Sequence, residues 1–256
     1  MISVCMAAFN GERFIREQIE SILAQLSQDD ELIISDDGSS DSTCEIIRSF
    51  ADERIHLVFN QGEHGFTPNF ENALTNARGD FIFLSDQDDV WLDGKVDKML
   101  RALETNDLAI SDCITVNENL EILQQSRFEE FHIRPGFLRH FIKSRYLGCC
   151  MAFKRSFLSA LLPFPRNGNL VEHDIWIAAM GFLYYRVGLI KTPLIYYRRH
   201  GQNASDGGFV GGYPLAVKIQ KRLYRLEQLA LRLPKVLKCK QKRNAGNNGR
   251  PTKEGQ

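Results

Sequence analysis

The sequence predicts an α/β protein with a Rossmann-like, mostly parallel sheet flanked by helices. Apolar runs of strand length alternate with segments whose apolar residues recur at helical spacing through most of residues 2–110. This alternation is typical of parallel strands that are joined through helices. Two turns rich in aspartate also follow strand-like runs directly, and sheets of this kind bind ligands at the carboxyl ends of their strands.

The first two strand-helix units set the pattern for the rest of the chain. A continuous apolar run over residues 2–8 predicts a buried strand, and an Asn-Gly turn leads into an amphipathic helix over residues 15–26. A strand over residues 31–35 follows, and a capping box that begins at Ser42 opens a helix over residues 42–50. Further strands are predicted over residues 55–59, 81–84, 108–110, 147–153 and 190–197. Further helices are predicted over residues 67–77, 96–103, 136–141 and 155–162. In the first of these helices we expect Thr67 as the cap and Pro68 at the first helical position.

The domain organisation follows from composition. The chain of 256 residues is 43% apolar and 25% charged, which is typical of a globular protein, and we see no linker-like change before Gly207. We therefore predict one domain over residues 1–207, a basic helical extension over residues 208–243 and a disordered tail over residues 244–256. Pro234 is expected to end the helix of the extension. The apolar stripe of this helix consists of Ile219, Leu223, Leu226, Ala230 and Leu233.

Charge is segregated along the chain although the net charge is zero. From Val210 to the end there are 12 basic and 2 acidic residues, which leaves 20 basic and 30 acidic residues before it. Basic charge confined to the tail, with no interleaved aromatic residues beyond Tyr213 and Tyr224, argues against a nucleic acid partner. It favours a peripheral contact of residues 214–243 with the inner face of the cell membrane, where basic side chains meet anionic lipid. The alternative is a helix packed on its own domain with a solvated basic face.

Cysteine usage and hydropathy indicate a compartment. The six cysteines form no CxxC pair and no zinc-type spacing, which favours a reducing cytoplasm. No signal-peptide pattern precedes the first strand. The longest apolar stretch, residues 175–190, is interrupted by Arg186 and is shorter than the roughly 20 residues of a spanning helix. We therefore expect a cytoplasmic protein that is neither secreted nor integral to a membrane.

Two acidic turns are candidate ligand sites. Asp36 and Asp37 close the second strand, where carboxylates can accept a hydrogen bond from a pyrimidine ring N–H or can simply cap the next helix. Asp86, Asp88 and Asp89 follow the fourth strand. A divalent cation would relieve their repulsion, since Mg²⁺ and Mn²⁺ bind one or two carboxylates and complete their shell with water and phosphate oxygens. A charged turn without a ligand is the alternative there.

Two further clusters occur later in the chain. Asp174 stands at the mouth of a predicted helix, where an aspartate serves either as a cap or as a catalytic base. Arg198, Arg199 and His200 are consecutive. Arginines of this kind clamp phosphate, and a histidine beside them can bind a metal or a phosphate. A solvated basic turn is the alternative.

Taken together, four stretches resemble the family-two glycosyltransferases with the GT-A fold, and among them the rhamnosyltransferase-like group. The resemblance spans about residues 2–206 and is specific in the order and spacing of its motifs. The stretches are "SVCMAAFNGERFIREQIESILAQ", "DELIISDDGSSDST", "NQGEHGFTPNFENALTNARGDFIFLSDQDDVW" and "HDIWIAAMGFLYYRVGLIKTPLIYYRRHGQNASDG".

The resemblance implies a nucleotide site at the first two strands. Ala7 and Phe9 match first-strand positions that meet the nucleotide, and Asp37, with Asp36 beside it, matches the aspartate that recognises the base. Ala8 departs from the family, in which many members have Thr, and this departure bears on the nucleotide pocket.

The resemblance also implies a metal site and a base. Asp86 and Asp88 match the DxD pair that binds the donor and an Mg²⁺ or Mn²⁺ ion, with Asp88 favoured as the direct metal ligand. Asp174 matches the catalytic base, and His200 the histidine that contacts the metal or the diphosphate. Ile175 stands where the related group commonly has Trp, so the acceptor side departs from the pattern.

The activity implied by the resemblance is that of an inverting, metal-dependent glycosyltransferase of hexosyltransferase type. It would move a sugar from a nucleoside-diphosphate donor to a hydroxyl of a glycan or lipid-linked glycan in surface polysaccharide biosynthesis. The subgroup favours deoxythymidine-diphosphate-linked rhamnose as the donor. The chain lacks the Gln-x-x-Arg-Trp motif of processive members, so we expect it to add one sugar or a few. Two alternatives stay open: a sugar-nucleotide nucleotidyltransferase, whose glycine-rich triphosphate loop is missing near the first strand, and a non-catalytic nucleotide-sugar-binding module.

Overall fold

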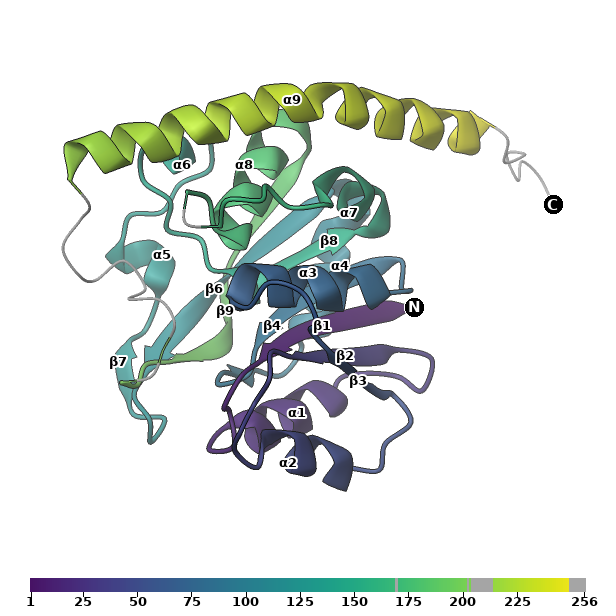
Figure 1. The fold of residues 1–256 in the computed structure, drawn as a ribbon, viewed down its shortest axis with the longest axis vertical. Helices are drawn as coiled ribbons and strands as arrows, with labels where there is room; N and C mark the ends of the chain where they lie inside the picture. The colour runs from purple at the N-terminus through teal and green to yellow at the C-terminus, as the bar shows by residue number, and fades with distance from the viewer. Residues whose placement is uncertain (169, 202, 204–213, 249–256) are drawn as a thin grey trace.

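The centre of the molecule is a nine-stranded sheet with strand order β3-β2-β1-β4-β8-β6-β9-β5, and β7 pairs with β6 (Figure 1). The computed structural model describes residues 1–168, 170–201, 203 and 214–248, with side chains as far as Lys242. The strands are β1 (Ile2–Ala8), β2 (Glu31–Asp36), β3 (Ile55–Phe59), β4 (Phe81–Asp86), β5 (Val90–Trp91), β6 (Leu108–Val116), β7 (Ile122–Gln124), β8 (Met151–Lys154) and β9 (Val187–Arg198).

Strand directions confirm a mixed, mostly parallel sheet. Strands β1 to β4 are parallel, β8 lies antiparallel between β4 and β6, and β9 is parallel to β6. Because β8 is antiparallel to both of its neighbours, β4 and β6, the strands β6 and β9 point the same way as the first four strands. The register places Ala8 beside Asp36 of β2, and Ala7 beside Asp86 of β4. The two acidic turns predicted from the sequence therefore flank the end of β1.

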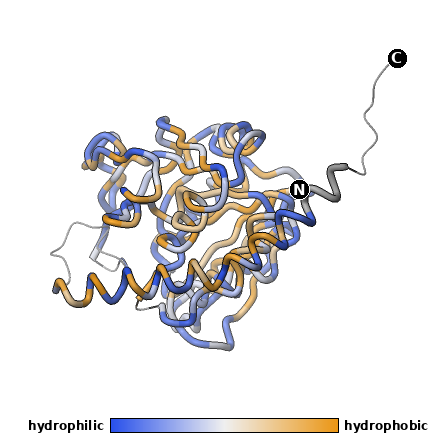
Figure 2. Tube along the Cα trace, turned by 90° about the horizontal axis from the view of Figure 1, so that it is seen from above, coloured by the Kyte–Doolittle hydropathy of each residue, from blue (hydrophilic) through white to orange (hydrophobic). Residues whose placement is uncertain are grey.

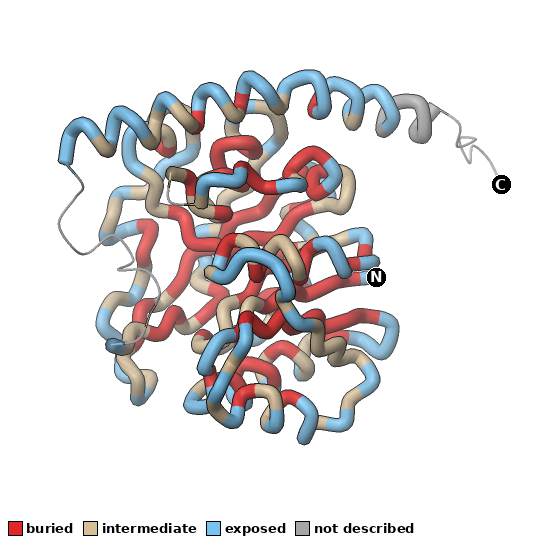
Figure 3. Tube along the Cα trace, viewed as in Figure 1, coloured by how far each residue is buried: buried red, intermediate tan, exposed pale blue. Residues whose placement is uncertain are grey.

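Helices cover the sheet so that its strands are buried, as Figure 3 shows. Helix α3 packs on β1, β2 and β3, while α4 packs on β6, β8 and β9. Burial on both faces explains why the strands read as continuous apolar runs rather than as alternating ones. The helices are α1 (Ile15–Leu23), α2 (Thr43–Ser49), α3 (Phe66–Asn76), α4 (Lys95–Thr105), α5 (Arg127–Glu130), α6 (Phe137–Ile142), the 3₁₀ turn η1 (Gly148–Cys150), α7 (Arg155–Leu161), α8 (His173–Tyr184) and α9 (Leu215–Asn248).

Two predicted caps are wrong in detail. Helix α3 begins at Phe66 with Gly65 as its N-cap, so Thr67 and Pro68 lie inside its first turn. The Thr67 hydroxyl instead accepts the backbone N–H of His173 at 3.3 Å and thereby ties α3 to the start of α8. Ser42 does occupy the N-cap position of α2, but its side chain makes no capping hydrogen bond.

Pro234 does not end the last helix, contrary to the prediction. Helix α9 runs through it to Asn248, five residues past the predicted end of the extension at residue 243. The missing N–H of a proline costs about 3 kcal/mol inside a helix. Packing on both sides of the proline offsets this cost, because Leu229 and Val236 are each only 1% exposed and belong to the core.

Basic side chains hold α9 against the domain. Arg232 donates to the carbonyl oxygens of Ala160, Leu161 and Leu162, at 3.0, 2.8 and 3.1 Å. These oxygens lie at the end of α7, where carbonyl groups have no partner within the helix. The Arg232 guanidinium also lies over the Trp176 ring. The helix thus packs on its own domain, as one of the two alternatives had it, and Figure 1 shows it crossing α6, α8 and α7.

The outer face of α9 carries the predicted apolar stripe. Ile219, Leu223, Leu226, Ala230 and Leu233 are all exposed, so the stripe does not form the contact with the domain. Within the described residues, no helix combines the length and apolar character that crossing a membrane requires. The predicted boundary at residue 207 and most of the predicted disordered tail lie outside the described residues.

Candidate active site

The three carboxylate-bearing turns converge on one cleft of about 780 Å³ at the carboxyl ends of β1, β2 and β4. Asp37, Asp88 and Asp174 all line it, although they lie far apart in the sequence. Parallel pairing causes the convergence, because it brings the ends of neighbouring strands to one edge of the sheet. Of the residues predicted from the sequence, the cleft is lined by Ala7, Phe9, Asp37, Asp86, Asp88 and Asp174.

A side-chain clamp fixes the end of β1 to the second acidic turn. The Gln87 amide accepts the Phe9 N–H and donates to the Phe9 carbonyl oxygen, both at 2.9 Å. Gly11 makes the clamp possible, since a Cβ at that residue would stand 2.2 Å from Gln87 Oε1. The Phe9 side chain is 53% exposed and lines the cleft, where it offers an apolar surface to a flat ligand. Sequence analysis missed the role of Gln87.

Asp37 presents its carboxylate to the cleft from a rigid setting. Oδ1 accepts from Asn60 at 2.6 Å and contacts His64 Nδ1 at 3.1 Å, and Oδ2 accepts the Gly65 N–H at 2.7 Å. These contacts hold the orientation of a carboxylate that is only 7% exposed. An oxygen held in this way is suited to accept a hydrogen bond from a nucleobase.

Asp36, which was predicted to bind the donor, does not line the cleft, so its donor-binding role stays a prediction. Its Oδ2 accepts the N–H groups of Gly38 and Ser39, both at 3.0 Å, inside its own turn. The alternative of a turn-forming aspartate therefore describes Asp36, while its neighbour Asp37 faces the ligand space.

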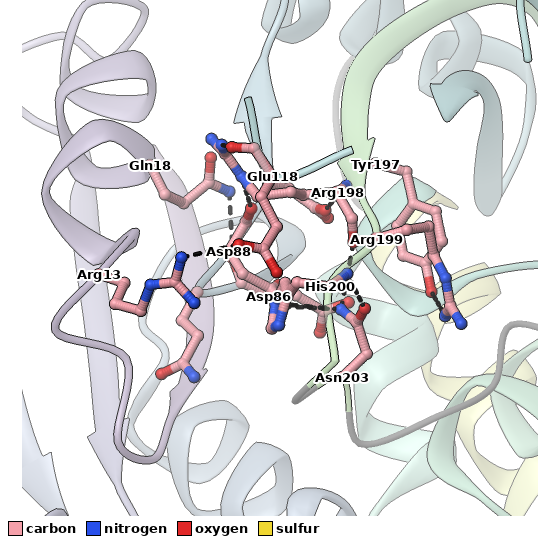
Figure 4. A network of polar contacts seen from close by, with 12 residues as sticks. Arg13, Gln18, Asp86, Asp88, Glu118, Tyr197, Arg198, Arg199, His200 and Asn203 are labelled. Atoms are coloured by element: carbon pink, nitrogen blue, oxygen red, sulfur yellow. Dashed lines mark hydrogen bonds and ion pairs between the residues drawn. The ribbon is translucent and has the colours of Figure 1, made fainter. Parts of the chain in front are cut away.

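Asp88 lies in a polar cluster with two residues that follow β9 (Figure 4). Its Oδ2 is 2.8 Å from His200 Nε2 and accepts from Asn203 Nδ2 at 3.0 Å. The His200 N–H donates to Asn203 Oδ1 at 2.7 Å, and its ring packs on Phe14 with centroids 4.8 Å apart. The predicted association of Asp88 with His200 is thus present in the fold. Asn203 was not predicted as a site residue, although it follows His200 by three positions in the last of the quoted stretches.

Arg198 supports this cluster rather than a phosphate. It is 2% exposed, its Nε donates to the Asp88 carbonyl oxygen at 2.8 Å, and its backbone N–H donates to Asp89 Oδ1 at 3.0 Å. The same guanidinium donates to the Glu118 carbonyl oxygen at 2.7 Å (Figure 4) and also pairs with Glu17 of α1. The interpretation of Arg198 as a phosphate clamp is therefore wrong, because its guanidinium is enclosed and committed to these groups.

Two sets of side chains could hold a divalent cation. In one set, Asp88 and His200 meet at 2.8 Å beside Asp86. In the other, ligand atoms of Asp86, Asp89 and Cys149 lie within 4.8 Å of one another. Burial, followed by the charge of Asp88, raises the pKa of Asp86 to about 7, as expected for crowded and buried carboxylates.

The first set fits Mg²⁺ or Mn²⁺ better. Burial raises the pKa of the Cys149 thiol well above its usual range, so this sulfur is held as a neutral thiol. Both ions prefer carboxylate, carbonyl and water oxygens over sulfur, and Mn²⁺ also accepts imidazole. The chemistry of Asp88, Asp86 and His200 therefore suits the cation that the sequence resemblance implies, whereas among the described residues only the set with Cys149 has its ligand atoms within 4.8 Å of one another.

Asp174 stands in the first turn of α8 and lines the cleft. Burial, followed by the charge of Glu172, raises its pKa to about 8. Its Oδ1 accepts the Ile175 N–H at 2.5 Å, which fixes the side chain. A carboxylate that holds a proton near neutral pH, placed on a rigid helix, has the properties of a general base.

Comparison with known proteins identifies the family. The model of "Glycosyl transferase family 2" matches residues 3–162, which is more than half of the chain. This chain belongs to glycosyl transferase family 2. The Bacillus subtilis protein EpsH is 30% identical over 213 residues, which cover 78% of this chain and 61% of EpsH. The Escherichia coli enzyme named "UDP-Glc:alpha-D-GlcNAc-diphosphoundecaprenol beta-1,3-glucosyltransferase WfgD" is 28% identical over 184 residues, 70% of each chain.

Solved structures place this family member in the GT-A-like fold. Staphylococcus aureus TarS 1–349 in complex with UDP-GlcNAc superposes with a TM-score of 0.65 at 16% identity, covering 87% of this chain and 65% of TarS. The mannosyltransferase PcManGT from Pyrobaculum calidifontis, in complex with GDP-Man and Mn²⁺, gives a TM-score of 0.58 at 20% identity, covering 93% and 73%. The fold class predicted from the sequence is confirmed.

Proposed function

We propose that this protein is an inverting, metal-dependent glycosyltransferase that moves a sugar from a nucleoside diphosphate to a hydroxyl of a glycan or lipid-linked glycan. One observation supports the proposal: Asp37, the pair Asp86 and Asp88, and the buried carboxyl of Asp174 all line the same cleft. The cleft volume of about 780 Å³ suits a nucleotide sugar, since ligand sites of this kind span about 300–1,000 Å³.

In this proposal each turn has one task. Asp37 accepts a hydrogen bond from the base, and Phe9 covers one side of the nucleotide. Asp88, Asp86 and His200 would hold Mg²⁺ or Mn²⁺, which neutralises the charge that develops on the departing diphosphate. Asp174 takes the proton of the acceptor hydroxyl as its oxygen bonds to the anomeric carbon. The bond from that carbon to the diphosphate breaks, the electron pair leaves with the diphosphate, and in-line attack inverts the carbon.

The relatives suggest the substrate class but leave the sugar open. WfgD is named for UDP-glucose and a diphosphoundecaprenol acceptor, and PcManGT was solved with GDP-mannose. Rhamnose, which the sequence resemblance favours, therefore enters the proposal as one donor among several. We also propose that the protein acts in surface polysaccharide synthesis at the cytoplasmic face of the cell membrane, and that it adds one sugar or a few.

Binding and hydrolysis of a donor panel test the proposal. The purified chain would be incubated with Mn²⁺ and dTDP-rhamnose, UDP-glucose, UDP-N-acetylglucosamine or GDP-mannose, and the melting temperature and the released nucleoside diphosphate would be measured. We expect one donor to raise the melting temperature and to be hydrolysed slowly, with both effects removed by EDTA. A donor that binds but is never cleaved, with or without acceptor glycans, would indicate the non-catalytic module instead.

A further inference from the structure

The outer face of α9 is a continuous line of exposed apolar side chains. Successive members are spaced by four or three residues, so the line follows the helix for 22 residues, roughly 33 Å. Figure 2 shows hydrophobic and hydrophilic turns alternating along the helix, and Figure 3 shows that its buried points face the domain. The line, named here the outer stripe, consists of Leu215, Ile219, Leu223, Leu226, Ala230, Leu233 and Leu237, and its large members are 41% to 71% exposed.

The helix that carries the outer stripe is strongly basic. Residues 215–248 contain ten Lys or Arg residues and a single acidic residue, Glu227. Arg225 and Arg232 are used against the domain, whereas Lys218, Lys238 and Lys242 are exposed. Leucines in a line beside cationic side chains are typical of a helix that lies in the plane of a membrane interface.

We infer that the outer stripe docks this protein on an anionic phospholipid surface. Charge decides between this occupant and a second copy of the chain. Two copies of α9 paired along their stripes would bring two helices of high positive charge together, which is unfavourable. An anionic bilayer instead gains about 1 kcal/mol for each Lys or Arg near its surface, and its planar interface accepts the full length of the stripe.

The inference deepens the proposed function, because it assigns the side from which the acceptor arrives. The segment before α8 borders both α9 and the cleft: Leu170 lies in a groove with Ile219 and Leu223, and Glu172 lines the cleft. Helix α8, which carries Asp174, is also fixed to α9, since the Tyr184 hydroxyl donates to the Leu229 carbonyl oxygen at 2.9 Å. Docking through α9 would therefore hold the cleft at a set height above the lipid head groups.

Vesicle co-sedimentation of the full chain tests the inference. We expect the protein to sediment with phosphatidylcholine vesicles containing about 30% phosphatidylglycerol and to remain in solution with phosphatidylcholine alone. Binding should fall steeply between about 0.1 M and about 0.5 M salt, because screening weakens contacts with the lipid charge. The double variant Leu223→Glu/Leu226→Glu should lose at least about tenfold in partitioning.

A matched control separates the stripe from charge alone. Gln220→Glu/Leu231→Glu adds the same two charges at exposed positions of α9 outside the stripe, and it should keep most of the binding. Donor hydrolysis and melting temperature, measured on both variants, show that the fold and the catalytic cleft are intact. The inference is overturned if the wild type does not sediment with anionic vesicles or if the two double variants bind these vesicles equally. It is also overturned if the leucine variant converts a dimer of this chain into monomers. Vesicle binding without any donor hydrolysis would remove the proposed function and leave this inference standing.

Discussion

We expect Asp174→Asn to lower kcat about 10²- to 10⁴-fold, the usual contribution of a general base. Asparagine has nearly the same shape, and its side-chain oxygen can still accept the Ile175 N–H that fixes Asp174 in the first turn of α8. Donor affinity should therefore change by less than about threefold, because the base acts on the acceptor. Initial rates of nucleoside diphosphate release and donor titration, carried out on one preparation, measure both quantities. Normal turnover in this variant would remove Asp174 from the mechanism.

The pH dependence of the reaction offers a second measurement of the same residue. With a pKa of about 8, Asp174 must lose its proton to act, so kcat/KM of the free enzyme should rise with pH and level off above about 8. Glu172→Gln is the matched control, because the charge of Glu172 is, after burial, the next cause of the raised pKa. We expect this variant to keep its activity and to shift the rising limb to lower pH. If kcat/KM of Glu172→Gln rises over the same pH range as in the wild type, another group controls the pH dependence.

Stability should vary with pH in the opposite sense. The pKa of Asp174 is raised in the folded state, so folding favours its protonated form. The contribution is fully present below about pH 4, where the unfolded chain also binds the proton, and is lost as the pH rises through about 8. The rate and the stability thus change in opposite directions across the same interval, which is typical of an active-site carboxyl held in a buried position.

Local pattern was sufficient to predict the part of the fold that carries the nucleotide. The strand at residues 2–8 coincides with β1, because a strand buried on both faces appears as an unbroken apolar run. The strand at residues 55–59 coincides with β3, although this strand is only partly buried at the edge of the sheet. Parallel pairing then determines that their carboxyl ends meet, which is why the convergence of Asp37 and Asp88 could be expected. These inferences use short-range periodicity and one rule of topology.

The errors share a different cause, since each depends on contacts between distant segments. Pro234 remains helical because Leu229 and Val236 are buried against the domain, and no local signal reports that packing. Arg198 was interpreted as a phosphate clamp, with a solvated basic turn as the alternative, yet it is enclosed by groups that include Glu17, 181 positions away.

The second large effect is expected at the cation cluster. Asp88→Asn should lower donor affinity measured with Mn²⁺ at least about tenfold and should abolish the difference between titrations with Mn²⁺ and with EDTA. Oδ2 of Asp88 lies 2.8 Å from His200 Nε2, so loss of this carboxylate removes the charge that would hold the cation there. His200→Ala should weaken the Mn²⁺ effect less, because a neutral ligand contributes less attraction than an anionic one.

Cys149→Ser distinguishes the two candidate cation sets. Cys149 belongs only to the set with Asp86 and Asp89, and serine keeps nearly the same size at this buried position. If the cation binds at Asp88 and His200, the serine variant retains the Mn²⁺ dependence of donor binding. If Cys149→Ser loses the Mn²⁺ dependence of donor binding while Asp88→Asn keeps it, the cation is bound by Asp86, Asp89 and Cys149. The role given to His200 is then wrong. Titration of each variant with Mn²⁺ alone, followed by melting temperature, decides the matter without depending on which sugar the enzyme transfers.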